Sequence, residues 1–151
     1  RAALGRDDFM VAPSNAVALA MIDNWLSWPL TKLALTGPLG SGKSHLTHVW
    51  ANEAGARIVM ATELADQDID ALAQHPIAVE GVDTIRADMA AQTALFHLHN
   101  LLQSAALPLL MTGSACPTCK AASMQRPTRR WRRPTTRCWA RFWQSSLLTA
   151  S

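Results

Sequence analysis

The chain has 151 residues, of which 49% are hydrophobic and 17% are charged, so it can bury a core of its own in one domain. The longest aliphatic block, Leu107–Met111, is far shorter than the roughly 20 residues of a membrane span, so no membrane segment is expected. Three cysteines without a framework spacing argue against a disulfide scaffold and favour a reducing, cytoplasmic location.

The formal net charge of +3 conceals a division along the chain. Residues 1–113 contain all eleven acids and six lysines and arginines, a net charge of −5. Residues 114–151 contain eight lysines and arginines and no acid, a net charge of +8. This division predicts a core domain over 1–113 and a basic segment, rich in Arg, Trp and Pro, over 114–151.

Residues 9–29 are predicted to form a lead-in segment with one helix. Ser14 or Asn15 can cap its N-terminus, and Trp28-Pro29 is expected to end it, because the residue before a proline disfavours helical backbone. Four apolar side chains of this segment recur at helical spacing: Ala18, Met21, Ile22 and Trp25.

The rest of the core alternates between strands and helices. The predicted order is strand 33–36, helix 44–54, strand 57–60, helix 62–74, strand 77–79, helix 86–105 and strand 107–111. Gly55 is expected to stop the first of these helices, whereas Thr62 is expected to cap the second and Pro76 to close it. The third carries an apolar stripe: Leu95, Leu98, Leu101, Leu102 and Ala105. The alternation predicts an α/β fold, a parallel sheet covered by helices on both faces.

The segment between the first strand and its helix fits the phosphate-binding pattern G-x-x-x-x-G-K-[ST]. It consists of Gly37, Pro38, Leu39, Gly40, Ser41, Gly42, Lys43 and Ser44. Glycines let the backbone curl so that its N–H groups converge on an anion at the helix N-terminus. Lys43 is expected to reach the phosphates of ATP or ADP, and the Ser44 hydroxyl to ligate Mg²⁺. A glycine-rich turn without a ligand is the structural alternative.

Acidic residues follow the strand at 77–79, where phosphoryl chemistry requires a group that holds Mg²⁺. Glu80 is the candidate for this metal-side acid, acting through a water molecule. Gly81 occupies the position at which a second acid would orient the attacking water. Asp83 is a candidate substitute, and a turn residue is its structural alternative. The sequence therefore predicts nucleotide binding with weak or no intrinsic hydrolysis.

These residues carry a resemblance to a known family. Gly42-Lys43-Ser44-His45-Leu46 resembles the G-K-[ST]-H-L motif of the DnaA group of AAA+ ATPases, and Phe9-Met10-Val11 with Ser14-Asn15 resembles the lead-in of that group. The run Val79–Asp83 resembles the acidic motif of the smaller Hda-type branch, whose members lack the DNA-binding domain of the initiator. The resemblance covers about residues 7–113.

The resemblance implies a P-loop NTPase fold of the AAA+ class, with ATP or ADP and Mg²⁺ held at residues 37–44 beside His45. Hda-type regulators bind ADP, associate with the DNA-loaded sliding clamp, and promote hydrolysis of the ATP that DnaA holds. The implied partners are therefore DnaA and the clamp, and assembly with further copies of the chain is left open. The fifth strand and helical lid of a AAA+ module are not recognisable, so the expected core is partial.

The basic segment departs from the family. The motif Leu-Pro-Asp-Leu-x-Ser-Arg, which supplies an arginine acting in trans on the ATP of DnaA, is absent after Gly113. Codons for Cys116–Ala122, read one nucleotide upstream, permit Leu-Pro-Asp-Leu-Gln-Ser-Arg. We therefore expect that residues from about Ser114 are a frameshifted translation.

Two patterns in the basic segment suggest other chemistry. Cys116, Cys119 and Cys138 resemble part of a zinc site but lack a fourth ligand. The clusters 129–133 and 139–143 combine arginine with tryptophan and would bind nucleic-acid phosphates nonspecifically.

Two alternative functions remain open from the sequence. The first is a fragment of a DNA-binding replication initiator or loader, which would need a basic DNA-contacting element in the intact gene. The second is a small P-loop kinase, which would need a lid with several arginines, whereas residues 84–113 contain only Arg86.

Overall fold

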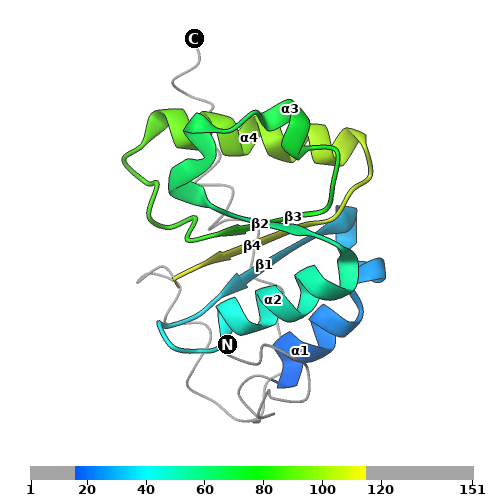
Figure 1. The fold of residues 1–151 in the computed structure, drawn as a ribbon. Coiled ribbons are helices and arrows are strands. Elements are labelled where there is room, and N and C mark those ends of the chain that lie inside the picture. Colours follow the sequence, from blue (N-terminus) through cyan, green and yellow to red (C-terminus); the bar gives the residue numbers. More distant parts are fainter. Residues whose placement is uncertain (1–15, 115–151) are drawn as a thin grey trace. The chain divides into compact units, whose positions relative to one another are not determined.

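The computed structural model describes residues 16–114, and predictions for residues 1–15 and 115–151 concern residues outside this range. Its centre is a parallel sheet in which β4 lies between β1 and β3 (Figure 1). The strand order is β1-β4-β3-β2. The four strands are β1 (Lys32–Thr36), β2 (Arg57–Met60), β3 (Ile77–Glu80) and β4 (Leu109–Gly113).

Helices cover both faces of this sheet (Figure 1). On one face lie α1 (Ala16–Asp23) and α2 (Lys43–Ala54), and on the other lie α3 (Ile69–Leu72) and α4 (Met89–Ser104). The predicted α/β architecture is therefore confirmed. Within residues 16–114, no helix combines the length and the apolar character needed to cross a membrane.

The alternation of side chains along the strands divides the core between the two faces. On the α2 face, Leu33 and Leu35 of β1 cluster with Ala78 of β3 and Leu110 of β4. The indole rings of Trp28 and Trp50 stack in the same cluster, with ring centroids 5.3 Å apart. The residues between these on β3 and β4 are also buried and face α3 and α4: Ile77, Val79, Leu109 and Met111.

The first helix ends earlier than predicted. α1 stops at Asp23, and the short 3₁₀ turns η2 (Trp25–Ser27) and η3 (Pro29–Thr31) lead into β1. The Trp28 indole Nε1 donates to the carbonyl of Met21 at 2.7 Å. This carbonyl would accept the N–H of Trp25 in a continued helix, so the buried tryptophan offers a competing donor at the helix end.

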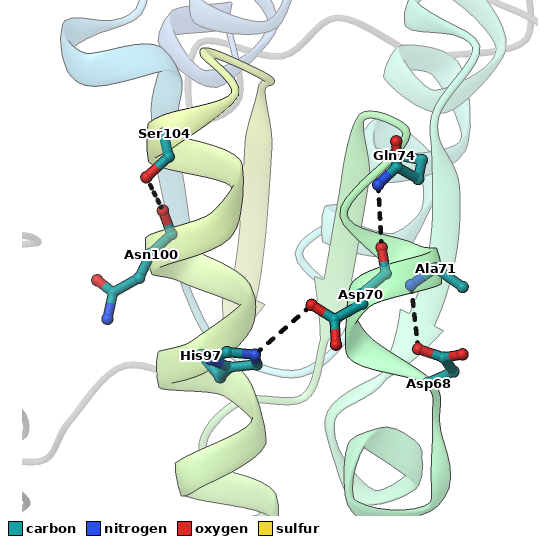
Figure 2. Close-up of polar contacts among 7 residues, drawn as sticks. All are labelled: Asp68, Asp70, Ala71, Gln74, His97, Asn100 and Ser104. Carbon is teal, nitrogen blue, oxygen red and sulfur yellow. Dashed lines mark hydrogen bonds and ion pairs between the residues drawn. The ribbon is translucent and has the colours of Figure 1, made fainter.

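The predicted helix over 62–74 is wrong. The segment is divided into a 3₁₀ helix, η4 (Ala61–Asp66), and the one-turn helix α3. Thr62 does not act as a cap; instead, the carboxylate of Asp68 accepts the N–H of Ala71 at 3.1 Å and starts α3 (Figure 2). An aspartate is a stronger cap than a threonine, and it begins the helix six residues later.

The last helix and strand shift slightly from their predicted positions. α4 starts at Met89, where the Asp88 carboxylate accepts the N–H of Ala91 at 3.0 Å. Ala105, which was expected in the apolar stripe, is exposed beyond the helix end. β4 begins at Leu109 rather than 107, because Pro108 has no N–H to donate to a neighbouring strand.

Candidate phosphate-binding site

The loop from β1 to α2 has the backbone shape that its glycines predict. Gly40 and Gly42 have φ values of 76° and 82°, in the left-handed region that side chains with a Cβ rarely adopt. A Cβ on Gly37 would lie 2.9 Å from Oγ of Ser41, closer than real contacts allow. Gly42 directly precedes Lys43, the first residue of α2. The sequence pattern is therefore matched by the conformation that needs it.

The ammonium group of Lys43 lies over this loop. Its Nζ donates to the carbonyl oxygens of Gly37 at 2.9 Å and Pro38 at 2.7 Å, and lies 3.3 Å from Oγ of Ser41. These acceptors are all neutral. Because a hydrogen bond to an ionised acceptor is roughly twice as strong, phosphate oxygens would compete well for this ammonium.

The first turn of α2 adds backbone donors at the same place. The first hydrogen bond within the helix runs from the N–H of Leu46 to the carbonyl of Gly42 at 3.0 Å. The N–H groups of the three residues before Leu46 therefore precede the helical ladder: Lys43, Ser44 and His45. Ser44 is exposed and His45 is partly buried. No acid occupies this turn, so its partial positive charge is not offset from within the helix.

The topology places the loop and the acids that follow β3 at the same edge of the sheet, with β4 between them. The chain leaves β1 for α2 on one face and leaves β3 for α4 on the other, so the direction of the connections reverses above β4 (Figure 1). Ligands of open parallel sheets bind at such a reversal, outside the carboxyl ends of the strands. Leu35 is paired with Thr112, and Val79 with Met111, so Glu80 is level with the last residues of β1.

Glu80 has the surroundings expected for a metal-side acid. It alternates with Val79 and therefore shares the α2 face with Ala78. Its Oε1 is buried and accepts no hydrogen bond from the residues that the structure describes. A buried carboxylate oxygen without a protein donor is suited to a cation or a water molecule.

The donor set fits Mg²⁺ rather than a metal held by the protein alone. Residues 16–114 contain no group of three or more His, Cys, Asp or Glu side chains that could hold a metal ion. Mg²⁺ is commonly bound by one or two protein oxygens together with substrate phosphates and water. Ser44 can supply one oxygen directly, and Glu80 can hold a water molecule that supplies another, so the residues present fit this ion.

The backbone explains the glycine at position 81. Gly81 has a φ of 71°, and its carbonyl accepts both the N–H of Thr84 at 2.9 Å and the Thr84 hydroxyl at 2.7 Å. An acid at this position would have to adopt the left-handed conformation. The tight turn after β3 therefore disfavours the second acid that the sequence also lacks.

Asp83 is used to hold the backbone after β4. Its Oδ1 accepts the N–H of Ser114 at 2.9 Å. Burial raises the pKa of Asp83. The hydrogen bonds with Ser114 and the charge of Arg86 together lower it by more than burial raises it, so the pKa of Asp83 is below its usual value. These contacts favour the alternative in which Asp83 is a structural turn residue rather than a substitute for the second acid. Ser114 itself was not predicted, because its partner lies 31 residues away and no local pattern marks the contact.

Comparisons with known proteins identify the fold. No protein-family model and no curated protein matches the chain. Among solved structures, AMPPCP-bound DnaA from Aquifex aeolicus has a TM-score of 0.68 at 17% identity, over 95% of this chain and 49% of that chain. DnaA bound to AMPPCP and single-stranded DNA has a TM-score of 0.70 at 17% identity, over 95% of this chain and 48% of that chain. Domain III of Thermotoga maritima DnaA has a TM-score of 0.63 at 17% identity, over 75% of this chain and 57% of that chain.

These similarities show that the chain shares the fold of these DnaA structures, which here is a four-stranded parallel sheet flanked by helices. The predicted fold class is thereby confirmed. The chain spans about half the length of the DnaA structures that it matches.

Proposed function

We propose that residues 37–44 bind the phosphates of ATP or ADP together with Mg²⁺, and that the chain acts as a AAA+ nucleotide-binding module. The observation that carries this proposal is the Lys43 ammonium, which lies over the loop carbonyls of Gly37 and Pro38 at the N-terminus of α2. Two DnaA structures of the same fold were solved with the ATP analogue AMPPCP, which supports the nucleotide class.

Each residue of the site has a distinct role in this proposal. The N–H groups at the start of α2 and the Lys43 ammonium bind phosphate oxygens. Ser44 holds Mg²⁺ directly, and Glu80 holds it through a water molecule. His45 lies beside the phosphate-binding residues. When bound, the ion neutralises phosphate charge at the point where a γ-phosphate would be transferred.

The finer proposal is a regulator of replication initiation of the Hda type, which inactivates DnaA by promoting its ATP hydrolysis. It is supported by the DnaA-like fold and by the resemblance of residues 42–46 and 79–83 to this branch. Gly81 suits a protein whose own hydrolysis is weak or absent. Under this proposal, the partners are DnaA and the DNA-loaded sliding clamp, and the module also assembles with further copies.

Nucleic-acid binding is a separate proposal for the basic segment. One DnaA structure of this fold was solved with single-stranded DNA. Residues 16–114 contain nine acids and four lysines and arginines, so this part of the chain is unfavourable for phosphate backbones. Binding would depend on residues 115–151, which lie outside the described range.

Calorimetric titration with Mg·ADP and Mg·AMPPCP tests the nucleotide site. The full chain should bind both ligands, and Lys43→Ala should abolish the binding. Lys32→Ala is the matched control, because it removes a lysine from the opposite end of β1. Equal affinity of the Lys43→Ala variant and the unaltered chain would contradict the proposal.

The regulatory role is tested by ATP hydrolysis in a mixture with DnaA, the clamp and DNA. The chain as printed should fail to stimulate this hydrolysis, because the arginine that acts in trans is absent from its sequence. The nucleotide sequence across codons 111–120 provides the complementary test. If the neighbouring frame encodes the Leu-Pro-Asp motif, the corrected protein should stimulate hydrolysis.

A further inference from the structure

The backbone that leaves β4 is held from both sides. On the side of β1, the N–H of Gly37 donates to the carbonyl of Gly113 at 3.3 Å. On the side of β3, the carboxylate of Asp83 accepts the N–H of Ser114 at 2.9 Å. The Gly113 carbonyl and the Ser114 N–H belong to the same peptide group. One rigid peptide therefore joins the first residue of the phosphate loop to Asp83.

This peptide continues a line of hydrogen bonds that starts at the proposed ligand-binding lysine. Lys43 Nζ donates to the carbonyl of Gly37, whose own N–H donates to Gly113. The carbonyl and the N–H of Gly37 belong to successive peptide groups that meet at its Cα, so a movement of Gly37 changes the geometry of both hydrogen bonds. The line ends at Asp83, the only carboxylate that bonds this peptide among the residues described.

Gly113 and Asp83 are fitted to each other. A Cβ on Gly113 would lie 3.0 Å from Oδ1 of Asp83 and 3.1 Å from Cγ2 of Val82. Both distances are tighter than ordinary contacts, so any larger residue would displace the carboxylate that holds Ser114. The contact between Asp83 and Ser114 therefore depends on Gly113 at the end of β4 and on an acid at position 83, after β3.

We propose that Asp83 is a positioning residue that couples the phosphate loop to the chain beyond β4, so that nucleotide bound at residues 37–44 fixes Ser114 more firmly. This inference rests on the proposed nucleotide site. The element with two arrangements is Lys43, which bonds either the loop carbonyls or the phosphates. A bound nucleotide orders the loop, including Gly37, and the shared peptide carries this order to Ser114.

The coupling is reciprocal. If nucleotide strengthens the contact between Asp83 and Ser114, then that contact must strengthen nucleotide binding by the same factor. Asp83 thereby acts without touching phosphate or metal. Ser114 directly follows β4, so the coupling makes the backbone at the end of this strand responsive to occupancy of the site.

Hydrogen exchange of single amides in the full chain tests the coupling. On addition of saturating Mg·ADP, exchange at Ser114 should slow by about fivefold or more, the lower end of typical allosteric coupling. Ala91 provides a matched control, because its N–H is bonded by the Asp88 carboxylate at 3.0 Å in the same manner but outside the line of bonds. Its exchange should not change.

Variants test the reciprocal effect. Asp83→Asn and Asp83→Ala should weaken Mg·ADP binding by about the same factor as the change in exchange at Ser114, whereas Asp88→Asn and Asp88→Ala should not. If the unaltered chain binds Mg·ADP but Ser114 exchange is unchanged, this inference is overturned and the proposed nucleotide site stands. If the chain does not bind Mg·ADP, both are overturned. The exchange measurement needs no variant, so it holds even if Asp83→Ala does not fold.

Discussion

Nζ of Lys32 donates a hydrogen bond to Nε2 of His99 at 2.9 Å and thereby joins β1 to α4. The same ammonium also donates to the side-chain oxygen of Gln103 at 2.9 Å. Since a lysine ammonium can only donate, Nε2 must be the acceptor and His99 must be neutral. Burial and the charge of Lys32 lower the pKa of His99, and the contact with Asn100 opposes this only in part.

This pair predicts a loss of stability in acid. The pKa of His99 is lower in the folded chain than the value of about 6.5 for an unfolded chain, so the unfolded state takes up the proton first. The contribution of neutral His99 is complete above about pH 6.5 and is lost as the pH falls toward the folded-state pKa. His99→Gln should therefore reduce the drop in melting temperature between pH 7 and pH 5.

His97 is the control for this measurement. It lies on the exposed side of α4, with Nε2 3.9 Å from the carboxylate of Asp70 (Figure 2). His97→Gln should leave most of the acid sensitivity in place. Equal pH dependence of His99→Gln and the unaltered chain would show that the pair with Lys32 is not a source of the effect.

Replacement of Gly81 should be costly because of its backbone conformation. Gly81→Asp places a side chain at a φ of 71°, at a cost of about 1–2 kcal/mol in the free energy of unfolding. Intrinsic ATP hydrolysis should not fall, since the variant restores an acid where a second one is expected. Gly81→Asn should destabilise less, because asparagine tolerates this conformation better. Chemical denaturation and a phosphate-release assay measure the two effects.

The metal role of Glu80 predicts a change in the Mg²⁺ dependence of binding. Glu80→Gln keeps the shape of the side chain but removes the charge of the buried Oε1. Addition of EDTA should weaken ATP binding to the unaltered chain much more than binding to this variant. Glu63→Gln, at an exposed acid of η4, should behave like the unaltered chain. The same loss on EDTA addition in Glu80→Gln would exclude Glu80 from the metal site.

Helix caps give a prediction about stability alone. Asp68→Ala and Asp88→Ala remove the side-chain acceptors that start α3 and α4, at a cost of about 1 kcal/mol each. Thr62→Ala should change the free energy of unfolding by less than about 0.5 kcal/mol, because Thr62 caps nothing and is exposed. A larger loss for Thr62 than for Asp68, measured by urea denaturation, would contradict the assignment of the cap.

Local patterns in the sequence located all four strands and the phosphate loop, although β4 begins at Leu109 rather than 107. The glycines before Lys43 and the apolar runs of the four strands each determine a short piece of backbone by themselves. The helix over 62–74 was wrong because periodicity cannot decide between two competing caps, Thr62 and Asp68. The end of α1 was wrong because it depends on the indole of Trp28, a contact between residues seven apart.

The sequence could predict only those parts of the candidate site that are formed within one continuous segment of the chain. Residues 37–44 and Glu80 could be proposed as site residues, since each lies directly after a predicted strand, and their roles stay predictions. The contact of Asp83 with Ser114 requires knowledge that β3 and β4 are neighbours. Likewise, only the backbone angle of Gly81 explains why no acid stands there.

The central position of β4 has a consequence for how the chain folds during synthesis. Of the described strands, β4 is made last, yet it lies between β1 and β3. Until residues 109–113 have left the ribosome, β1 has no neighbouring strand in this sheet, while β2 and β3 can already pair. The phosphate loop therefore cannot be fixed beside Glu80 before nearly all of the core is synthesised, and a chain arrested before β4 would expose the unpaired edges of β1 and β3 to aggregation.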